Sequence, residues 1–136
     1  MPKFKMIILA LVFASILPVS AQEFADVPAL HTFAVGYAGT ESKVYQTFRA
    51  VLDKGEAAKP IFRRCLKTGS PAAKLYSAIG LYKLDPQEGT KALKSLASSD
   101  EQVPVMQGCI VSTYTVGEVA SDLLSPNPQL LSFQAF

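Results

Sequence analysis

Two helix starts of the same kind follow one another in the middle of the chain. Ser70 stands before Pro71, and Asp85 stands before Pro86. Ser and Asp side chains accept hydrogen bonds from the free N–H groups of a first helical turn, and Pro fits the first helical position because no donor is needed there. The apolar residues after each start recur at helical spacing. The pattern therefore predicts two consecutive helices.

Further helices are expected on both sides of this pair. In "TESKVYQTFRAVLDKG" the apolar residues have helical spacing, Thr40 is a suitable first cap and Gly55 suits the position after the end. The next segment carries Pro60, so its helix must begin near that residue. Residues 118–124 also have a helical pattern. Gly80 lies inside an expected helix, where a missing side chain lets another backbone approach closely.

The character of the sequence changes after Asp100. The stretch that follows is rich in Val, Ile, Thr and Tyr, and Pro104 and Gly108 interrupt any early helix. We expect an irregular or short extended segment near Val103–Thr113. Together these patterns predict an all-α domain of about four to five helices.

The amino terminus has the three parts of a secretory signal peptide. Lys3 and Lys5 precede an apolar run that ends at Leu17, and small residues follow up to a cleavage site between Ala21 and Gln22. The apolar run is shorter than the about 20 residues needed to span a bilayer, so we expect no stable membrane insertion after signal removal. The expected location is the periplasm or the outside of the cell.

These patterns divide the chain into four segments. We expect a signal peptide at 1–21, a loosely structured lead-in at 22–39, a helical domain at 40–124 and a C-terminal tail at 125–136. The lead-in has two glycines and a proline but no sustained period, and the tail is punctuated by prolines.

The charge of the chain argues against nucleic acid as a partner. Two of the 13 Lys and Arg residues lie in the expected leader, so the rest of the chain carries as many basic as acidic residues. The densest basic cluster surrounds Arg63 and Arg64, and a helix would spread it around its circumference. Binding to phosphates requires basic residues gathered on one face.

Two cysteines remain after the expected leader, Cys65 and Cys109. Export places a protein in an oxidising compartment, and an even number of cysteines there indicates a disulfide. We therefore expect these two residues to be paired.

The succession of helices in "GEAAKPIFRRCLKTGSPAAKLYSAIGLYKLDPQEGTKALKSLASS" resembles HEAT-type helical-repeat proteins. Together with "VGYAGTESKVYQTFRAVL" and a later "GC", the chain is also similar to small exported bacterial proteins of unassigned function. The resemblance extends over about residues 36–109. It implies a compact arrangement of HEAT-like helix pairs and brings no catalytic residues with it.

No residue pattern indicates catalysis, a metal site or a cofactor. His31 is the only histidine, which excludes a site built from several histidines and leaves a single base for any Ser or Cys nucleophile. Paired carboxylates are the remaining catalytic possibility. Most of the candidate carboxylates stand at expected helix starts, where the helix dipole favours a negative charge without any catalytic role. The full set of candidates is Glu41, Asp53, Glu56, Asp85, Glu88, Asp100, Glu101, Glu118 and Asp122.

Three tyrosines are candidate partner contacts. Tyr37 lies between glycines in the lead-in, and Tyr76 and Tyr82 flank the apolar stripe of one expected helix. We expect a non-enzymatic module that binds another envelope or secreted protein. A carboxylate-dependent enzyme or inhibitor acting on cell-envelope polymers, and a structural envelope protein, are the two alternatives.

Overall fold

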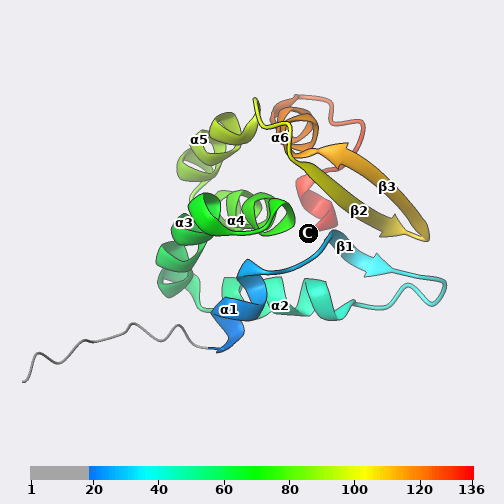
Figure 1. Cartoon of the computed structure of the whole chain (residues 1–136), viewed down its shortest axis with the longest axis horizontal. Helices are drawn as coiled ribbons and strands as arrows, with labels where there is room; N and C mark the ends of the chain where they lie inside the picture. Colours follow the sequence, from blue (N-terminus) through cyan, green and yellow to red (C-terminus); the bar gives the residue numbers. More distant parts are fainter. Residues whose placement is uncertain (1–18) are drawn as a thin grey trace, which may run out of the picture.

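The computed structural model describes residues 19–136, with side chains from Ala21 onward, and it shows a mixed α/β fold (Figure 1). The helices are α1 (Val19–Ala25), α2 (Lys43–Leu52), α3 (Ala58–Thr68), α4 (Pro71–Leu84), α5 (Pro86–Leu96) and α6 (Val116–Leu124), with short 3-10 helices η1 (Gly55–Ala57) and η2 (Phe133–Ala135). The strands are β1 (Leu30–Val35), β2 (Gln102–Gly108) and β3 (Ile110–Thr115). The expectation of an all-α fold is therefore wrong.

The two Pro-initiated helices begin where the sequence predicts. Ser70 accepts a hydrogen bond from the N–H of Ala73, and Asp85 accepts bonds from the first turn of α5. Pro71 and Pro86 occupy the first positions of their helices. The caps and the prolines thus set the starts of α4 and α5.

The sheet joins two parts of the chain that lie far apart in sequence. Its order is β1-β2-β3, with β1 parallel to β2 and β2 antiparallel to β3. His31 pairs with Met106, and helices α2 to α5 form the long connection between these strands. Parallel strands need such a crossover.

Two sequence expectations change because of this sheet. The segment 22–39 contains the end of α1 and the whole of β1, so it is not a loosely structured lead-in. The segment expected near Val103–Thr113 is a hairpin of two full strands. Strand β1 has only six residues, and its pairing partner lies beyond four helices.

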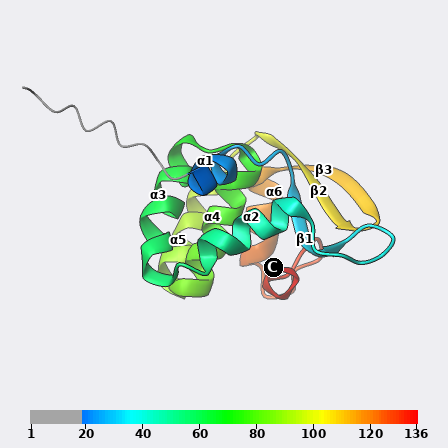
Figure 2. The same cartoon turned by 90° about the horizontal axis from the view of Figure 1, so that it is seen from below.

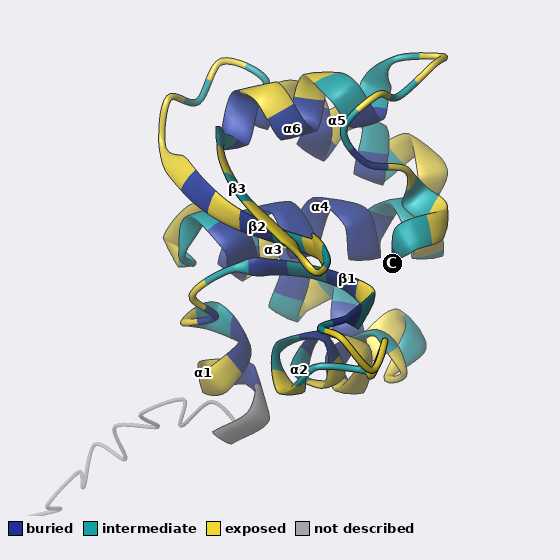
Figure 3. Ribbon diagram, turned by 90° about the vertical axis from the view of Figure 1, so that its right-hand side faces the viewer, coloured by how far each residue is buried: buried dark blue, intermediate teal, exposed yellow. Residues whose placement is uncertain are grey.

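Helix α4 lies at the centre of the fold. It contacts α3 and α5 on one side and β1, β2 and α6 on the other, and nine of its 14 residues are buried. In Figure 3 it is the most continuously buried element, and Figure 2 shows α2, α3 and α5 around it. The core beside it is aromatic: Tyr76 stacks on Phe48 with ring centroids 4.7 Å apart, and Phe24 and Phe62 complete the cluster.

Two glycines allow the helices around α4 to approach closely. A Cβ atom on Gly80 would lie 2.5 Å from the ring of Phe62, so the close contact here is with a side chain and not with another backbone. A Cβ atom on Gly89 of α5 would lie 2.1 Å from the Cα atom of Tyr82 in α4. The backbone approach expected at Gly80 therefore occurs at Gly89.

The C-terminal segment is packed into the fold. Leu131 and Phe136 are buried in the same core cluster as α4, and the ring of Phe136 meets Tyr76 edge-on at 6.1 Å. The end of the chain lies between the helices and the sheet (Figure 1). Residues 125–136 are thus a structural part of the domain.

Candidate binding groove

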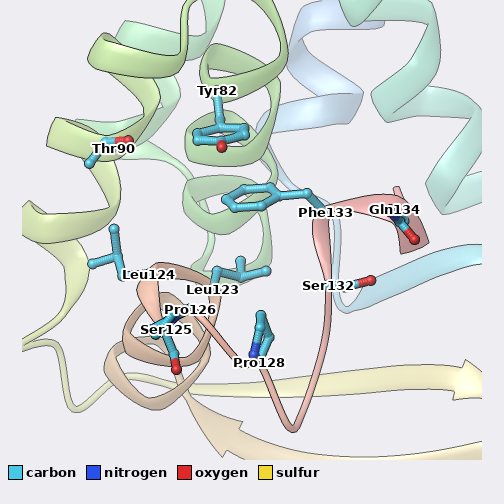
Figure 4. A pocket seen from close by; sticks show the side chains of 10 residues that line it. All are labelled: Tyr82, Thr90, Leu123, Leu124, Ser125, Pro126, Pro128, Ser132, Phe133 and Gln134. Carbon is cyan, nitrogen blue, oxygen red and sulfur yellow. The ribbon is translucent and has the colours of Figure 1, made fainter.

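An open cavity lies between α4, α5, the end of α6 and the C-terminal segment (Figure 4). Its volume is about 490 Å³, and it is partly open to solvent. We call it the tail groove. Its lining residues are Tyr82, Thr90, Leu123, Leu124, Ser125, Pro126, Pro128, Ser132, Phe133 and Gln134.

An aromatic pair forms one wall of the tail groove. The rings of Tyr82 and Phe133 are stacked with centroids 3.8 Å apart and planes 7° from parallel. Tyr82 belongs to α4 and Phe133 to η2, so this contact attaches the C-terminal segment to the central helix. Figure 4 shows the two rings face to face above Leu123 and Pro128.

The part of the C-terminal segment before η2 is held by one carboxylate. Asp122 accepts hydrogen bonds from the backbone N–H groups of Gln129, Leu130 and Leu131, at 2.8–3.0 Å. Lys83 donates a hydrogen bond to the carbonyl oxygen of Phe136. The segment that lines the groove is therefore fixed near both ends, and the groove is largely formed before any ligand arrives.

The lining of the tail groove carries no acidic or basic side chain. Its polar groups are hydroxyls and one amide, from Thr90, Ser125, Ser132 and Gln134, together with the phenol of Tyr82. Hydroxyls and amides both donate and accept hydrogen bonds. Such a surface suits an uncharged ligand that has an apolar body and a few polar groups.

The carboxylates considered as catalytic candidates are mostly engaged in structural contacts. Glu41 binds Arg49, Glu88 binds Arg63 and Glu101 binds Lys74, each through a salt bridge. The hydrogen bond from Arg63 lowers the pKa of the Glu88 carboxyl. Three further carboxylates act at helix starts or in the tail, as caps or backbone acceptors: Asp85, Glu118 and Asp122.

His31 lies on β1 beside the start of α2. Its Nδ1 atom lies 2.9 Å from the hydroxyl of Ser42, the residue that caps α2. Burial lowers the pKa of the His31 imidazole. No cluster of His, Cys, Asp and Glu side chains able to hold a metal occurs among residues 21–136.

Tyr76 lies in the core and not on a contact surface. Its side chain has no exposed area, and its hydroxyl accepts a hydrogen bond from the N–H of His31 and donates one to the same residue's C=O. Burial raises the pKa of this phenol. Of the three candidate contact tyrosines, Tyr82 reaches the tail groove, whereas Tyr76 fastens β1 to α4.

Tyr37 is fully exposed at one end of the sheet, away from the tail groove. It stands in the turn after β1, whose Gly36 N–H donates to the C=O of Gly108 in the β2–β3 turn. Both turns project on the same side of the molecule in Figures 1 and 2. Ile110 and Val111, which follow Gly108 along the hairpin, are also exposed. Tyr37 therefore lies near the exposed hairpin, whereas Tyr82 lines the tail groove, and the two tyrosines belong to different surfaces.

The expected disulfide is not formed. Cys65 is buried on α3, and Cys109 is exposed in the β2–β3 turn at the other side of the molecule (Figure 1). Burial raises the pKa of the Cys65 thiol, which keeps it protonated. The even number of cysteines carried no information about where the fold places them, and both thiols are free.

The expected cleavage site lies at the border of the described chain. Ala21 and Gln22 are within α1, and Ala21 is buried. The apolar run expected to form the signal sequence lies outside the described residues. Among residues 19–136, no helix combines the length and the apolar character needed to cross a bilayer.

Sequence reasoning missed most of the tail groove. Phe133, Leu123 and Thr90 come from three different segments, and the prolines of the tail indicate only irregular structure. One sequence signal could have indicated that the tail is packed. The apolar stretch "LLSF" follows the prolines, and several apolar residues in a row are unusual in a fully solvated tail.

Comparison with known proteins finds no similar protein. No protein-family model matches the chain, no curated protein matches it, and no solved structure matches it. The resemblance to HEAT-type proteins stays a prediction.

Proposed function

We propose that this protein is a non-enzymatic binding module that receives an uncharged, apolar segment of another protein in the tail groove. The observation that carries the proposal is an open cavity of about 490 Å³ with a stacked aromatic wall and no ionised side chain in its lining. Cavities of this size that combine apolar walls with polar groups are typical of binding sites, and the lining here has polar and apolar parts in similar measure. The partner would be an envelope or secreted protein, in keeping with the predicted leader.

The chemistry of the lining favours a peptide segment over a charged metabolite. A charged ligand entering the groove would lose water without gaining an opposite charge. An apolar or aromatic side chain can pack on Tyr82 and Phe133, while the hydroxyls of Thr90 and Ser132 bind the backbone beside it. Buried aromatic anchors of this kind dominate the energy of protein interfaces.

A catalytic role has less support. A general acid or base must come within hydrogen-bond reach of the reacting group. The tail groove offers no carboxylate, histidine or thiol for this purpose, and Tyr82 is its one titratable residue. The groove therefore provides contact and shape but no proton relay.

The test fills the groove with a tryptophan side chain introduced by substitution; the natural chain contains no tryptophan. The probe is a phage-displayed library of random peptides, selected on the wild-type protein. We expect enriched peptides with aromatic or branched apolar residues and few charges. Because the new side chain occupies the groove, Thr90→Trp should weaken binding of a selected peptide at least about tenfold, a loss of about 1.4 kcal/mol.

The matched control is Thr68→Trp, an exposed threonine at the end of α3 outside the groove. This variant should bind the same peptide as the wild type does. Enrichment of highly charged peptides, or equal binding by Thr90→Trp and wild type, would reject the tail groove as the binding site.

A further inference from the structure

Strand β3 is an open edge of the sheet. It pairs with β2 on one side, and within residues 19–136 no other backbone group bonds to it. The edge lacks the usual protection, because β3 contains no proline and no charged residue. None of its residues is buried, and Ile110 and Val111 are 69% and 63% exposed. Edges of this kind are templates for pairing with another strand.

The hydrogen bonds next to β3 show which of its residues face the open edge. In an antiparallel pair, successive residues alternately bond the neighbouring strand and point away from it. Val116 donates its N–H to Glu101, one step beyond the last pair of β2 and β3. The even-numbered residues of β3 therefore bond β2, and Val111 and Thr113 direct their N–H and C=O groups outward. The N–H of Thr115 is already used by the Glu118 carboxylate.

We propose that the open edge of β3 pairs antiparallel with β3 of a second copy of this chain, with Ser112 on the twofold axis. This inference goes beyond the proposed function, because the edge is separate from the tail groove. In this register Val111 and Thr113 of each copy exchange about four N–H···O=C bonds. The alternative register, centred on Thr113, would place Val111 opposite Thr115. The N–H of Thr115 already donates to the Glu118 carboxylate, so it could not bond the second copy.

The side chains of β3 are compatible with pairing to a second copy of the strand. An antiparallel twofold pair keeps each face of the sheet continuous, so Ile110 lies across from Tyr114 of the other copy and Val111 from Thr113. Branched and aromatic residues form favourable cross-strand pairs. The whole stretch from Gln102 to Gly117 carries no charge, so two copies meet without like-charge repulsion. The pairing also covers Ile110 and Val111, which are exposed in the single chain.

The register predicts a specific disulfide trap in the full chain. Directly opposite residues have Cβ atoms about 4.5–5.5 Å apart, near the range that a disulfide bridges. In a Cys109→Ser background, Ser112→Cys should give a covalent dimer under mild oxidation. Thr113→Cys is the control, one residue away and on the other face, and should give several-fold less. Equal yields, or no covalent dimer from Ser112→Cys, overturn the proposed register.

The second test measures self-association by sedimentation of the purified protein over a range of concentrations. The wild type should dimerise, and Thr113→Pro should raise the dissociation constant at least about tenfold, because it removes two of the bonds between copies. Thr113→Val keeps the N–H and should stay close to wild type. The Thr113 N–H does not bond β2, so circular dichroism should show both variants folded.

A wild-type protein that stays monomeric at every concentration overturns the proposal. So does a dimer that persists unchanged in folded Thr113→Pro, since its interface would lie elsewhere. A monomer whose β3 edge captures a strand of a different protein would also contradict the second copy as occupant.

Discussion

Helix α4 and strand β3 both carry branched apolar and aromatic side chains, but their surroundings are opposite. Nine of the 14 residues of α4 are buried, and it has neighbours on every side; β3 has no buried residue and a backbone partner on one side. Figure 3 shows this difference as a largely buried helix beside a largely exposed hairpin. Apolar composition therefore does not decide burial. The number of elements that the topology places around a segment does.

The largest effect should come from the contact between α5 and α4. Gly89→Ala would put a Cβ atom 2.1 Å from the backbone of Tyr82, which cannot move as a flexible side chain can. We expect a loss of about 3 kcal/mol in the free energy of unfolding, measured by urea denaturation. Lys91→Ala on the exposed face of α5 should change it by less than about 0.5 kcal/mol. A loss of less than about 1 kcal/mol for Gly89→Ala would show that the helices can separate easily.

The next effect tests the link between α4 and the sheet. Tyr76→Phe removes the hydroxyl that satisfies both the N–H and the C=O of His31. Leaving these partly buried groups without a protein partner should cost about 1 to 2 kcal/mol. Tyr82→Phe is the matched control in the same helix, where we expect little change because that hydroxyl faces the tail groove. Equal stability of the two variants would contradict the role given to Tyr76.

A smaller effect should follow from the pH dependence of β1. Burial lowers the pKa of folded His31 below the ordinary value of about 6.5, so the unfolded chain binds the proton more readily between these two values. Stability should therefore fall as the pH drops through about 6.5, and the loss should end below the folded pKa. Denaturation of wild type and His31→Asn at several pH values tests this. The stability difference between the two proteins should stay constant with pH if His31 titrates equally in both states.

The smallest effect should be found in β3. Val111→Ser changes a side chain that is 63% exposed, and in dilute, monomeric protein it should alter the unfolding free energy by less than about 0.5 kcal/mol. Thermal denaturation at low protein concentration is sufficient for this comparison. A loss comparable with that of Tyr76→Phe would mean that β3 is packed more tightly than its exposure indicates.

Local chemistry explains what could be predicted. The caps at Ser70 and Asp85 act within three residues, so the sequence shows them directly, and both helices begin there. The pairing of His31 with Met106 depends on how helices α2 to α5 fold back, which no local pattern records. For this reason the sequence predicts helices α2 to α6 but neither α1 nor the pairing of the sheet.

The candidate site was only partly predictable for the same reason. Tyr82 was identified as a contact residue, but its stacking partner Phe133 arrives from a segment that was expected to be a tail. For the cysteines, the sequence predicts a bond that the structure does not contain. Their even number favoured a bond, yet α3 and the hairpin turn hold them at different sides of the molecule.

If the predicted leader is removed after Ala21, helix α1 bears on when that cut can occur. It continues without a break from Val19 to Ala25, across the predicted cleavage bond, and Phe24 just after that bond is fully buried among the core aromatics. Proteases cut exposed, irregular chain far more readily than packed helix. A leader peptidase would therefore have to act before Phe24 enters the core, and folding would then close the new amino terminus against further trimming.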